Sequence, residues 1–258
     1  MNEKNLITYY NKFNEDKRIT HRHTIVEYTT AMKYIHEYLN KMNNPKILDV
    51  GAGTGAYSVK LAEEGYDVSA VELVKHNLMT LKAKNSHVKP YLGNATDLSI
   101  FKNNSFDMVL LFGPLYHLIK KEDKIKALME AKRVVKDNGY ILVSYYMNEY
   151  AIIIHGFKDN TILDAIKNND VDDDFHVTPK ETDLYSMVRL EDIDELNTLS
   201  KLKRIKILAQ DGPSDYIRKI INKMDEETFN IYIKYHLKTC EKKELLGASS
   251  HVLDILQK

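Results

Sequence analysis

Three glycines separated by single residues, Gly51, Gly53 and Gly55, follow a short apolar run and precede a segment that can form a helix. Glycine lets the backbone turn sharply and approach a ligand closely, and the amide groups at a helix N-terminus attract anionic groups. The letters G-A-G-T-G-A at 51–56 also satisfy the dinucleotide pattern G-x-G-x-x-G/A. The spacing therefore predicts a ligand-binding turn, with a nicotinamide dinucleotide as one candidate ligand.

A carboxylate comes just before this turn. Asp49 lies two residues before the first glycine, at the end of the apolar run. A buried negative charge there would repel a pyrophosphate, so Asp49 disfavours an NAD(P)-dependent oxidoreductase. It suits a ligand that carries an ammonium group. The amino-acid end of S-adenosylmethionine (SAM) has one, together with a carboxylate that the glycine amides and the helix N-terminus can receive.

The elements that would position these residues alternate between strands and helices. Short apolar runs predict five strands, at 47–50, 68–71, 88–92, 106–112 and 140–147. Helical spacing of apolar residues predicts helices at 19–42, 57–62, 77–84 and 121–135. Strand–helix–strand units at this spacing form a parallel sheet.

This alternation changes after residue 148. We predict a helix over 149–168, a strand over 185–188, a helix over 191–199 and a strand over 204–209. The rest is predicted as helices, one with a stripe formed by Phe229, Tyr232, Ile233, His236 and Leu237, and a terminal one with Val252, Leu253, Ile255 and Leu256. The expected fold class is α/β: a seven-stranded, mostly parallel, doubly wound sheet with a helical lid and a C-terminal helical extension.

The segment I-L-D-V-G-A-G-T-G at 47–55 resembles the first motif of the class I SAM-dependent methyltransferases. The resemblance covers about residues 45–147, with further motifs V-S-A-V-E-L at 68–73, G-N-A-T-D-L at 93–98, F-D-M-V-L-L at 106–111 and A-K-R-V-V-K-D-N-G-Y at 131–140. It implies a Rossmann-like fold, SAM as the cofactor, S-adenosylhomocysteine (SAH) as its product, and methyl transfer as the reaction.

The resemblance also implies roles for individual residues. Glu72 falls where the family's acidic residue bonds both ribose hydroxyls, which one carboxylate can do. Asn94 and Ala95 match the pair beside the adenine, although a turn residue is the alternative for Asn94. Phe112 falls where the fourth strand reaches the methionine moiety. The implied cofactor-binding residues are Asp49, Gly51, Ala52, Gly53, Gly55, Glu72, Leu73, Asn94, Ala95 and Phe112.

The loop after the fourth strand, G-P-L-Y-H-L at 113–118, is the expected acceptor side. Methyl transfer needs alignment of the nucleophile and, for a protonated nucleophile, a general base. His117 is the candidate base and Tyr116 a second catalytic candidate, while a structural role for His117 stays open. The expected substrate pocket comprises Tyr9, Tyr10, His23, Tyr116 and His117.

Several features argue against a nucleic-acid acceptor. Base amino-methyltransferases carry Asp/Asn/Ser-Pro-Pro-aromatic where this chain has G-P-L-Y. Cytosine C5 methyltransferases need a nucleophilic cysteine in the core, whereas the one cysteine of this chain, Cys240, lies in the C-terminal part. Thirty-seven basic residues balance 37 acidic ones. We therefore predict a SAM-dependent methyltransferase acting on a small molecule. The alternatives are a SAM-binding module, a protein methyltransferase and, least favoured, an NAD(P)-dependent oxidoreductase.

The 258 residues are expected to form one methyltransferase domain. Its parts would be an N-terminal arm and helix (1–44), a SAM-binding core (45–147), a lid insertion (148–184), the last two strands (185–210) and C-terminal helices (211–258). The single cysteine, and the lack of a signal peptide or long apolar segment in the sequence, predict a cytoplasmic protein without a membrane partner. No metal site is expected, since His21 and His23 lack a third ligand. A monomer and a homodimer both fit.

Overall fold

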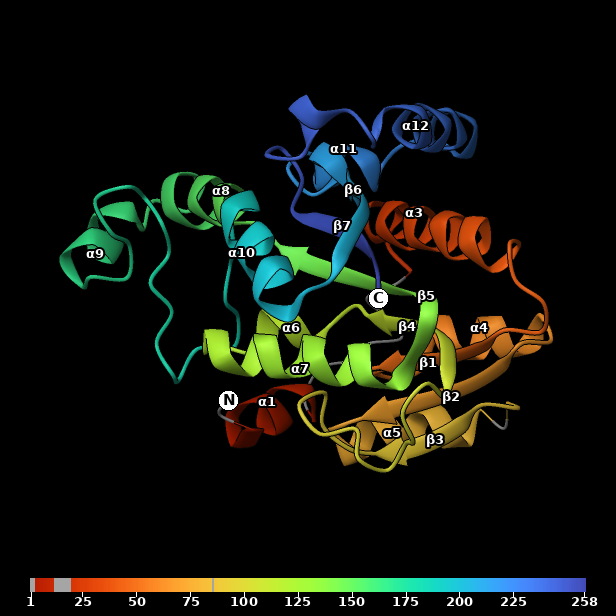
Figure 1. Cartoon of the computed structure of the whole chain (residues 1–258). Coiled ribbons are helices and arrows are strands. Elements are labelled where there is room, and N and C mark those ends of the chain that lie inside the picture. Colours follow the sequence, from red (N-terminus) through yellow and green to blue (C-terminus); the bar gives the residue numbers. More distant parts are fainter. Residues whose placement is uncertain (1–2, 12–19, 85) are drawn as a thin grey trace.

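The computed structural model describes residues 3–11, 20–84 and 86–258. At its centre is a seven-stranded sheet with the order β3-β2-β1-β4-β5-β7-β6 (Figure 1). The strands are β1 (Lys46–Val50), β2 (Asp67–Glu72), β3 (Lys89–Leu92), β4 (Phe106–Leu111), β5 (Val135–Tyr146), β6 (Lys203–Ala209) and β7 (His251–Gln257). Strands β1 to β5 pair in parallel, whereas β7 is antiparallel to β5 and β6. The predicted α/β, mostly parallel, doubly wound sheet is confirmed.

Helices cover both faces of the sheet. One face packs against α3 (Arg22–Leu39), α4 (Ala56–Glu63) and α5 (Lys75–Ala83), and the other against α6 (Pro114–His117), α7 (Lys121–Val134) and α10 (Leu190–Ser200). Neighbouring residues of a strand therefore both lie in a core: Ile47 packs toward α3 and Leu48 toward α7. Strands buried on both faces are apolar throughout, which explains the continuous apolar runs of the sequence.

Five of the remaining helical segments lie around the edge of the sheet toward which β5 points (Figure 1). They are α1 (Glu3–Tyr10), α8 (Asn148–Ala151), a π-helical turn (Ile152–Lys158), α9 (Ile162–Lys167) and α11 (Arg218–Ile221), whereas α12 (Glu226–Thr239) packs against α3. The helix expected over 149–168 is thus broken, and Asn160 adopts a left-handed φ of 57° at the break. The first residue expected for the 19–42 helix, Ile19, lies outside the described residues. Among the described residues, no helix combines the length and apolar character needed to cross a bilayer.

Two predicted elements of the C-terminal half are wrong. The residues expected in a terminal helix, Val252 to Leu256, form β7 in the interior of the sheet. The run V-L-D-I-L fits helical spacing as well as a strand buried on both faces, so spacing alone could not separate the two. Asp254 interrupts the run like a polar helix position, but its carboxylate is buried and accepts hydrogen bonds from Arg204.

The strand expected over 185–188 is also absent. Val188 makes a single bridge to Met147 at the end of β5, and the rest of this segment is irregular. The seventh strand is therefore β7, so the expected part 185–210 contains one strand and the part 211–258 contains helices followed by a strand. The other predicted strands agree with the structure to within two residues, except that β5 starts earlier. Residues 137–139, which lie between the helix predicted at 121–135 and the strand predicted at 140–147, belong to β5, and Asn138 has a φ of 64° there.

Candidate active site

A cavity of about 530 Å³ lies at the carboxyl edge of the parallel strands. The segments that follow β1, β2, β4, β5 and β6 all contribute to it, as expected for ligand sites in open α/β sheets. The first residue of β7 contributes as well, because an antiparallel strand begins at the edge where its parallel neighbours end. Every residue predicted for the cofactor or substrate lines this cavity, with the exception of Gly55.

Gly51 and Gly55 serve different purposes in the turn. Gly51 has a φ of 76°, and a Cβ there would lie 2.8 Å from the side chain of Pro114. Gly51 therefore allows the loop after β4 to pack directly on the turn after β1. A Cβ at Gly55, which has a φ of 91°, would lie 2.3 Å from Leu81 on α5. Gly55 is thus a packing residue that shapes the turn from behind the cavity.

Asp49 places a buried carboxylate in the cavity wall. Burial raises its pKa to about 7; the neighbouring Ser58 offsets part of the rise and the carboxylate of Glu72 adds to it. Its Oδ2 atom is buried without a hydrogen-bond partner in the described part of the chain. Asn77 also lines the cavity, and its buried Oδ1 likewise has no hydrogen-bond partner among the described residues. Unpaired buried oxygens are costly, so both point to a ligand that donates to them.

Glu72 is held in place by the backbone on both sides. Its Oε2 accepts a hydrogen bond from the amide of Gly53 at 2.8 Å, and its Oε1 accepts one from the amide of Val74 at 2.7 Å. These bonds tie the end of β2 to the glycine turn. A carboxylate has about four acceptor sites, so these two backbone bonds do not by themselves use all of the acceptor sites of Glu72.

Asn94 connects the cavity wall to α1. Its Nδ2 donates to the Glu3 carboxylate at 2.7 Å, and its Oδ1 accepts from the amide of Thr96 at 3.0 Å. The second bond is the local turn contact that sequence reasoning gave as the alternative. The first shows that α1 reaches the end of the cavity where Asn94 and Ala95 lie.

His117 is buried and has a partner at each ring nitrogen. Its Nδ1 donates to the carbonyl of Leu184 at 2.8 Å, so its Nε2 accepts from the hydroxyl of Tyr10, also at 2.8 Å. Burial lowers the pKa of His117 to about 4, although the Leu184 carbonyl opposes this. A neutral imidazole with both nitrogens engaged is well suited to hold α1 and the segment before Val188 against the loop after β4.

The part of the cavity next to the loop after β4 contains several tyrosines. Tyr116 donates from its hydroxyl to the carbonyl of Phe112 at 2.9 Å. Its ring lies 6.1 Å from that of Tyr185, which in turn lies 6.4 Å from Tyr9 of α1. His23, at the start of α3, also lines the cavity and contacts the Asn222 side chain at 3.0 Å. The predicted pocket residues are thus brought to one cavity, although they come from separate elements.

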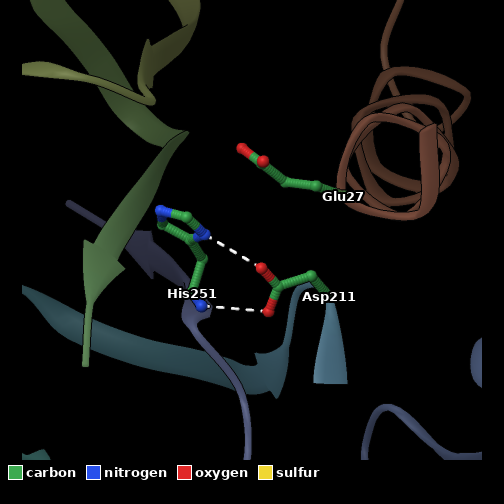
Figure 2. Close-up of side chains that lie close together, drawn as sticks. All are labelled: Glu27, Asp211 and His251. Carbon is green, nitrogen blue, oxygen red and sulfur yellow. Dashed lines mark hydrogen bonds and ion pairs between the residues drawn. The ribbon is translucent and has the colours of Figure 1, made fainter. Parts of the chain in front are cut away.

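Three of the cavity residues that were not predicted lie close together: Glu27, Asp211 and His251. One carboxylate oxygen of each acid and one ring nitrogen of His251 lie within 4.8 Å of one another. Figure 2 shows Glu27 reaching from α3 toward the other two, and His251 bound to Asp211. The His251 Nδ1 lies 2.9 Å from the Asp211 carboxylate. Glu27 and Asp211 are buried.

Comparisons with known proteins agree with this geometry. Residues 48–143 match the protein family described as a methyltransferase domain. A ubiquinone biosynthesis O-methyltransferase of Rickettsia felis is 24% identical over 225 residues, which are 85% of this chain and 87% of that protein. A glycine/sarcosine N-methyltransferase of Parasynechococcus marenigrum is 31% identical over 105 residues, but the match spans only 38% of this chain and 37% of that protein.

The fold comparison covers nearly the whole molecule. The crystal structure of a SAM-dependent methyltransferase from Methanosarcina mazei superposes with a TM-score of 0.59 at 17% identity, over 87% of this chain and 96% of that one. Residues 48–143 thus form a methyltransferase domain, and the chain as a whole has the fold of the class I SAM-dependent methyltransferases. Its cofactor is therefore SAM, and the Rossmann-like fold that the resemblance implied is confirmed.

The residues of this methyltransferase fit SAM chemically. The orphaned oxygen of buried Asp49 matches an ammonium group, and the carboxylate of Glu72 is an acceptor suited to hydroxyl groups. Glycine amides of the turn after β1 suit the cofactor's carboxylate. We expect these residues to hold the amino-acid end and the ribose of SAM. A pyrophosphate next to Asp49 and Glu72 would be repelled by both carboxylates.

Glu27, Asp211 and His251 could not be recognised as cavity residues from the sequence, for a different reason in each case. Glu27 lies in an amphipathic helix, where a glutamate is ordinarily on the solvent side, yet it is buried. Asp211 follows β6 at the edge of the sheet where Asp49 lies near the end of β1, and that topological position was the available signal. His251 could not be placed because β7 was taken for a helix.

Proposed function

We propose that this methyltransferase transfers the methyl group of SAM to a small-molecule acceptor bound at the tyrosine-lined end of the cavity. One observation carries the proposal: the cofactor residues and the tyrosines line a single cavity of about 530 Å³. This volume lies within the range of small-molecule sites, about 300–1,000 Å³. The names of two relatives, a glycine/sarcosine and a ubiquinone-biosynthesis methyltransferase, support an acceptor of this size.

The protein's part in such a reaction is mainly alignment and exclusion of water. SAM supplies a methyl group that is already activated by the sulfonium. Asp49 and Glu72 would fix the cofactor, while the loop after β4 packs against Gly51 and brings Tyr116 to the reaction site. Helix α1 is bonded to Asn94 and to His117, and so covers the cavity. Holding two reactants in line lowers the barrier by several kcal/mol.

The proposal includes a cytoplasmic location and no nucleic-acid partner, on the sequence grounds given above. A protein acceptor remains the competing function. Fractionation of an extract of the source organism after incubation with methyl-labelled SAM separates the two, because label enters either the small-molecule or the protein fraction. Label confined to protein would refute the small-molecule acceptor.

Cofactor binding provides the first test. We expect SAH to bind with micromolar affinity in a calorimetric titration, and Asp49→Ala and Glu72→Ala each to weaken it at least tenfold, or about 1.4 kcal/mol. Asp67→Ala is the matched control, since Asp67 is an exposed acid of β2 paired with Lys89. Unchanged affinity in both cavity variants would show that the cofactor lies elsewhere.

A further inference from the structure

The cluster of Glu27, Asp211 and His251 combines three separate elements at one point of the cavity. Glu27 belongs to α3, Asp211 follows β6, and His251 begins β7. Two buried carboxylates lie beside a histidine here. Burial of charged groups costs free energy, so such a cluster is a candidate functional site. These residue types could either bind a metal ion or transfer a proton. The hydrogen bonds of Asp211 distinguish the two roles.

Asp211 is committed to protein donors. Its Oδ1 accepts from the Ser249 hydroxyl at 2.7 Å and the His251 amide at 3.0 Å, and its Oδ2 accepts from His251 Nδ1 at 2.9 Å and from the Ser250 hydroxyl. Burial alone would raise the pKa of Asp211, but the bonds from His251 and Ser249 outweigh it, and the pKa lies below its ordinary value. A metal could bind Asp211 only by displacing these donors, so the group is an Asp–His pair rather than a metal cage.

This pair determines which nitrogen of His251 can accept a proton. The Asp211 carboxylate only accepts hydrogen bonds, so Nδ1 carries the hydrogen and neutral His251 has its lone pair on Nε2. Nε2 lies on the side of the ring away from Asp211 (Figure 2). A buried carboxylate that fixes the imidazole tautomer is the arrangement that orients a general base in catalytic triads.

His251 also lies next to the reaction side of the cavity. Its ring stacks on Tyr146 of β5, with centroids 5.2 Å apart and planes at 28°. It lies 6.0 Å from the ring of Tyr116, whose hydroxyl is bonded to the carbonyl of Phe112 at the end of β4. The histidine thus faces the loop at which the acceptor is expected.

The charges around this end of the cavity favour a cation. Glu27, Asp211 and Asp215 are all acidic, and Tyr116 and Tyr146 offer aromatic faces to a positive group. Among the described residues that line the cavity, Arg218 is the one lysine or arginine, and it lies 3.8 Å from Asp215. The acids thus outnumber the lysines and arginines among the described lining of this part of the cavity, so an ammonium group would be attracted and an anionic acceptor repelled.

We propose that the acceptor is an amine, which binds as its ammonium form beside Glu27 and gives a proton to His251, with Asp211 as the positioning residue. The inference rests on the proposed function and specifies its acceptor. Protonation blocks the nitrogen lone pair, so an amine must lose a proton before it can act as a nucleophile. A base at the acceptor end is the component that methylation of an ammonium requires.

The step balances in atoms and charge. The ammonium R–NH3⁺ transfers one proton to Nε2 of His251 and becomes R–NH2. Its lone pair then forms the nitrogen–carbon bond as the carbon–sulfur bond breaks, and that electron pair stays on sulfur in uncharged SAH. The product is R–NH2CH3⁺, and His251 returns its proton to solvent. Two positive charges enter, on the sulfonium and the ammonium, and two leave, on the methylammonium and the released proton.

The class of acceptor is tested with methyl-labelled SAM and a deproteinised metabolite extract of the source organism. We expect the label in compounds that a cation exchanger retains at acidic pH and releases with ammonia, and that resist ester hydrolysis. Label in neutral or acidic compounds would overturn the amine and leave the proposed function standing. No label in any fraction, from protein that binds SAH, would overturn both.

Variants test the residues. His251→Gln should lower kcat/KM about a hundredfold to ten-thousandfold with SAH affinity unchanged, and added imidazole should restore part of the rate. His36→Gln is the matched control, because His36 pairs with Glu64 at 2.6 Å on the surface of α3. A loss below tenfold for His251→Gln would overturn the role of His251. A chelator that abolishes turnover, or Zn²⁺ that restores it, would show a metal site instead.

A spectroscopic measurement tests the pair without any acceptor. In protein with ¹⁵N-labelled histidine, His251 of the SAH complex should show the Nδ1–H tautomer, and Asp211→Asn should abolish this preference. Glu27→Gln should weaken binding of the labelled amine's unmethylated parent to the SAH complex at least tenfold, whereas Glu37→Gln, an exposed glutamate of the same helix, should not. An Nε2–H tautomer in the wild type would overturn the assignment even if every variant failed to fold.

Discussion

Asp49 and Glu72 show how two acids in one cavity acquire different properties. Glu72 accepts two backbone amides, which stabilise its charge, whereas Asp49 has a buried oxygen without a partner and a pKa raised to about 7. His117 differs from both, because burial lowers its pKa to about 4 and its nitrogens are engaged. The candidate base of the G-P-L-Y-H-L loop is therefore better explained as a positioning residue that binds Tyr10.

The pKa of Asp49 predicts how SAH affinity depends on pH. Only the ionised carboxylate can pair with the ligand's ammonium, so affinity should fall about tenfold per unit as pH drops below 7. Calorimetric titrations between pH 5 and 8 measure this, and Asp49→Asn should remove the dependence. If the Asp49→Asn variant showed the same pH dependence of SAH affinity, another titratable group would be responsible for it.

Asp49 should also destabilise the ligand-free protein at high pH. A folded pKa raised above the ordinary value means that the folded state holds the proton more tightly, so its stability falls as pH rises from about 4 to 7. The cost reaches at most about 4 kcal/mol above pH 7. Asp49→Asn should therefore melt at a higher temperature than the wild type at pH 8 and gain less at pH 5. A lower melting temperature at pH 8 would contradict this.

At the scale of elements, β7 is joined to its neighbours by a buried polar group. Arg204 of β6 donates to the Asp254 carboxylate of β7 at 2.7 and 3.0 Å, and Asn197 of α10 donates to it at 2.7 Å. Burial raises the pKa of Asp254, although Arg204 and Asn197 oppose this. Asp254, the polar residue that made the β7 sequence resemble an amphipathic helix, thus links β7 to β6 and α10.

Removal of the Arg204 side chain should show how far the buried Asp254 carboxylate depends on it. Arg204→Met leaves a buried carboxylate without its cation and should cost about 3–5 kcal/mol in urea unfolding at pH 7. The cost should shrink at acidic pH, where Asp254 takes up a proton. Lys206→Met is the control, since Lys206 pairs with the half-exposed Glu241 and should cost less than about 1 kcal/mol. Equal costs would show that Asp254 does not depend on Arg204.

At the scale of the whole molecule, α1 connects parts of the cavity that lie far apart in the sequence. Glu3 is bonded to Asn94, Asn5 donates to the carbonyl of Thr182 at 3.2 Å, and Tyr10 donates to His117. The cofactor end, the loop after β4 and the segment after α9 are thereby held by one short helix. The N-terminal arm predicted from the sequence acts as a cover for one cavity.

Removal of residues 1–11 should therefore open the cavity. We expect SAH to dissociate at least tenfold faster from the truncated protein, measured by stopped-flow displacement. The fold should persist, because the sheet and its two cores do not include α1. Thr8→Ala is a mild control, since the Thr8 hydroxyl bonds only within α1 among the contacts described. An unchanged dissociation rate would show that α1 does not retain the ligand.

The cofactor end could be predicted because its residues lie in contiguous motifs directly after strands. Asp49, Gly51 and Glu72 need only the first βαβ unit to come together, and that unit follows from local apolar runs. The acceptor end could not be predicted in the same way. Glu27, Asp211 and His251 meet only when α3, β6 and β7 are packed, and β7 was assigned to the wrong element because burial on both faces removes the alternation that identifies a strand.

The position of β7 has a consequence for the order in which the molecule can be completed. The ribosome delivers β7 after the other six strands, yet it must enter the sheet between β5 and β6. Until then both of those strands have an unpaired edge, which exposes the nascent chain to association with other chains. The same late strand carries His251. A chain interrupted before β7 therefore has its glycine turn but lacks the histidine of the proposed Asp–His pair.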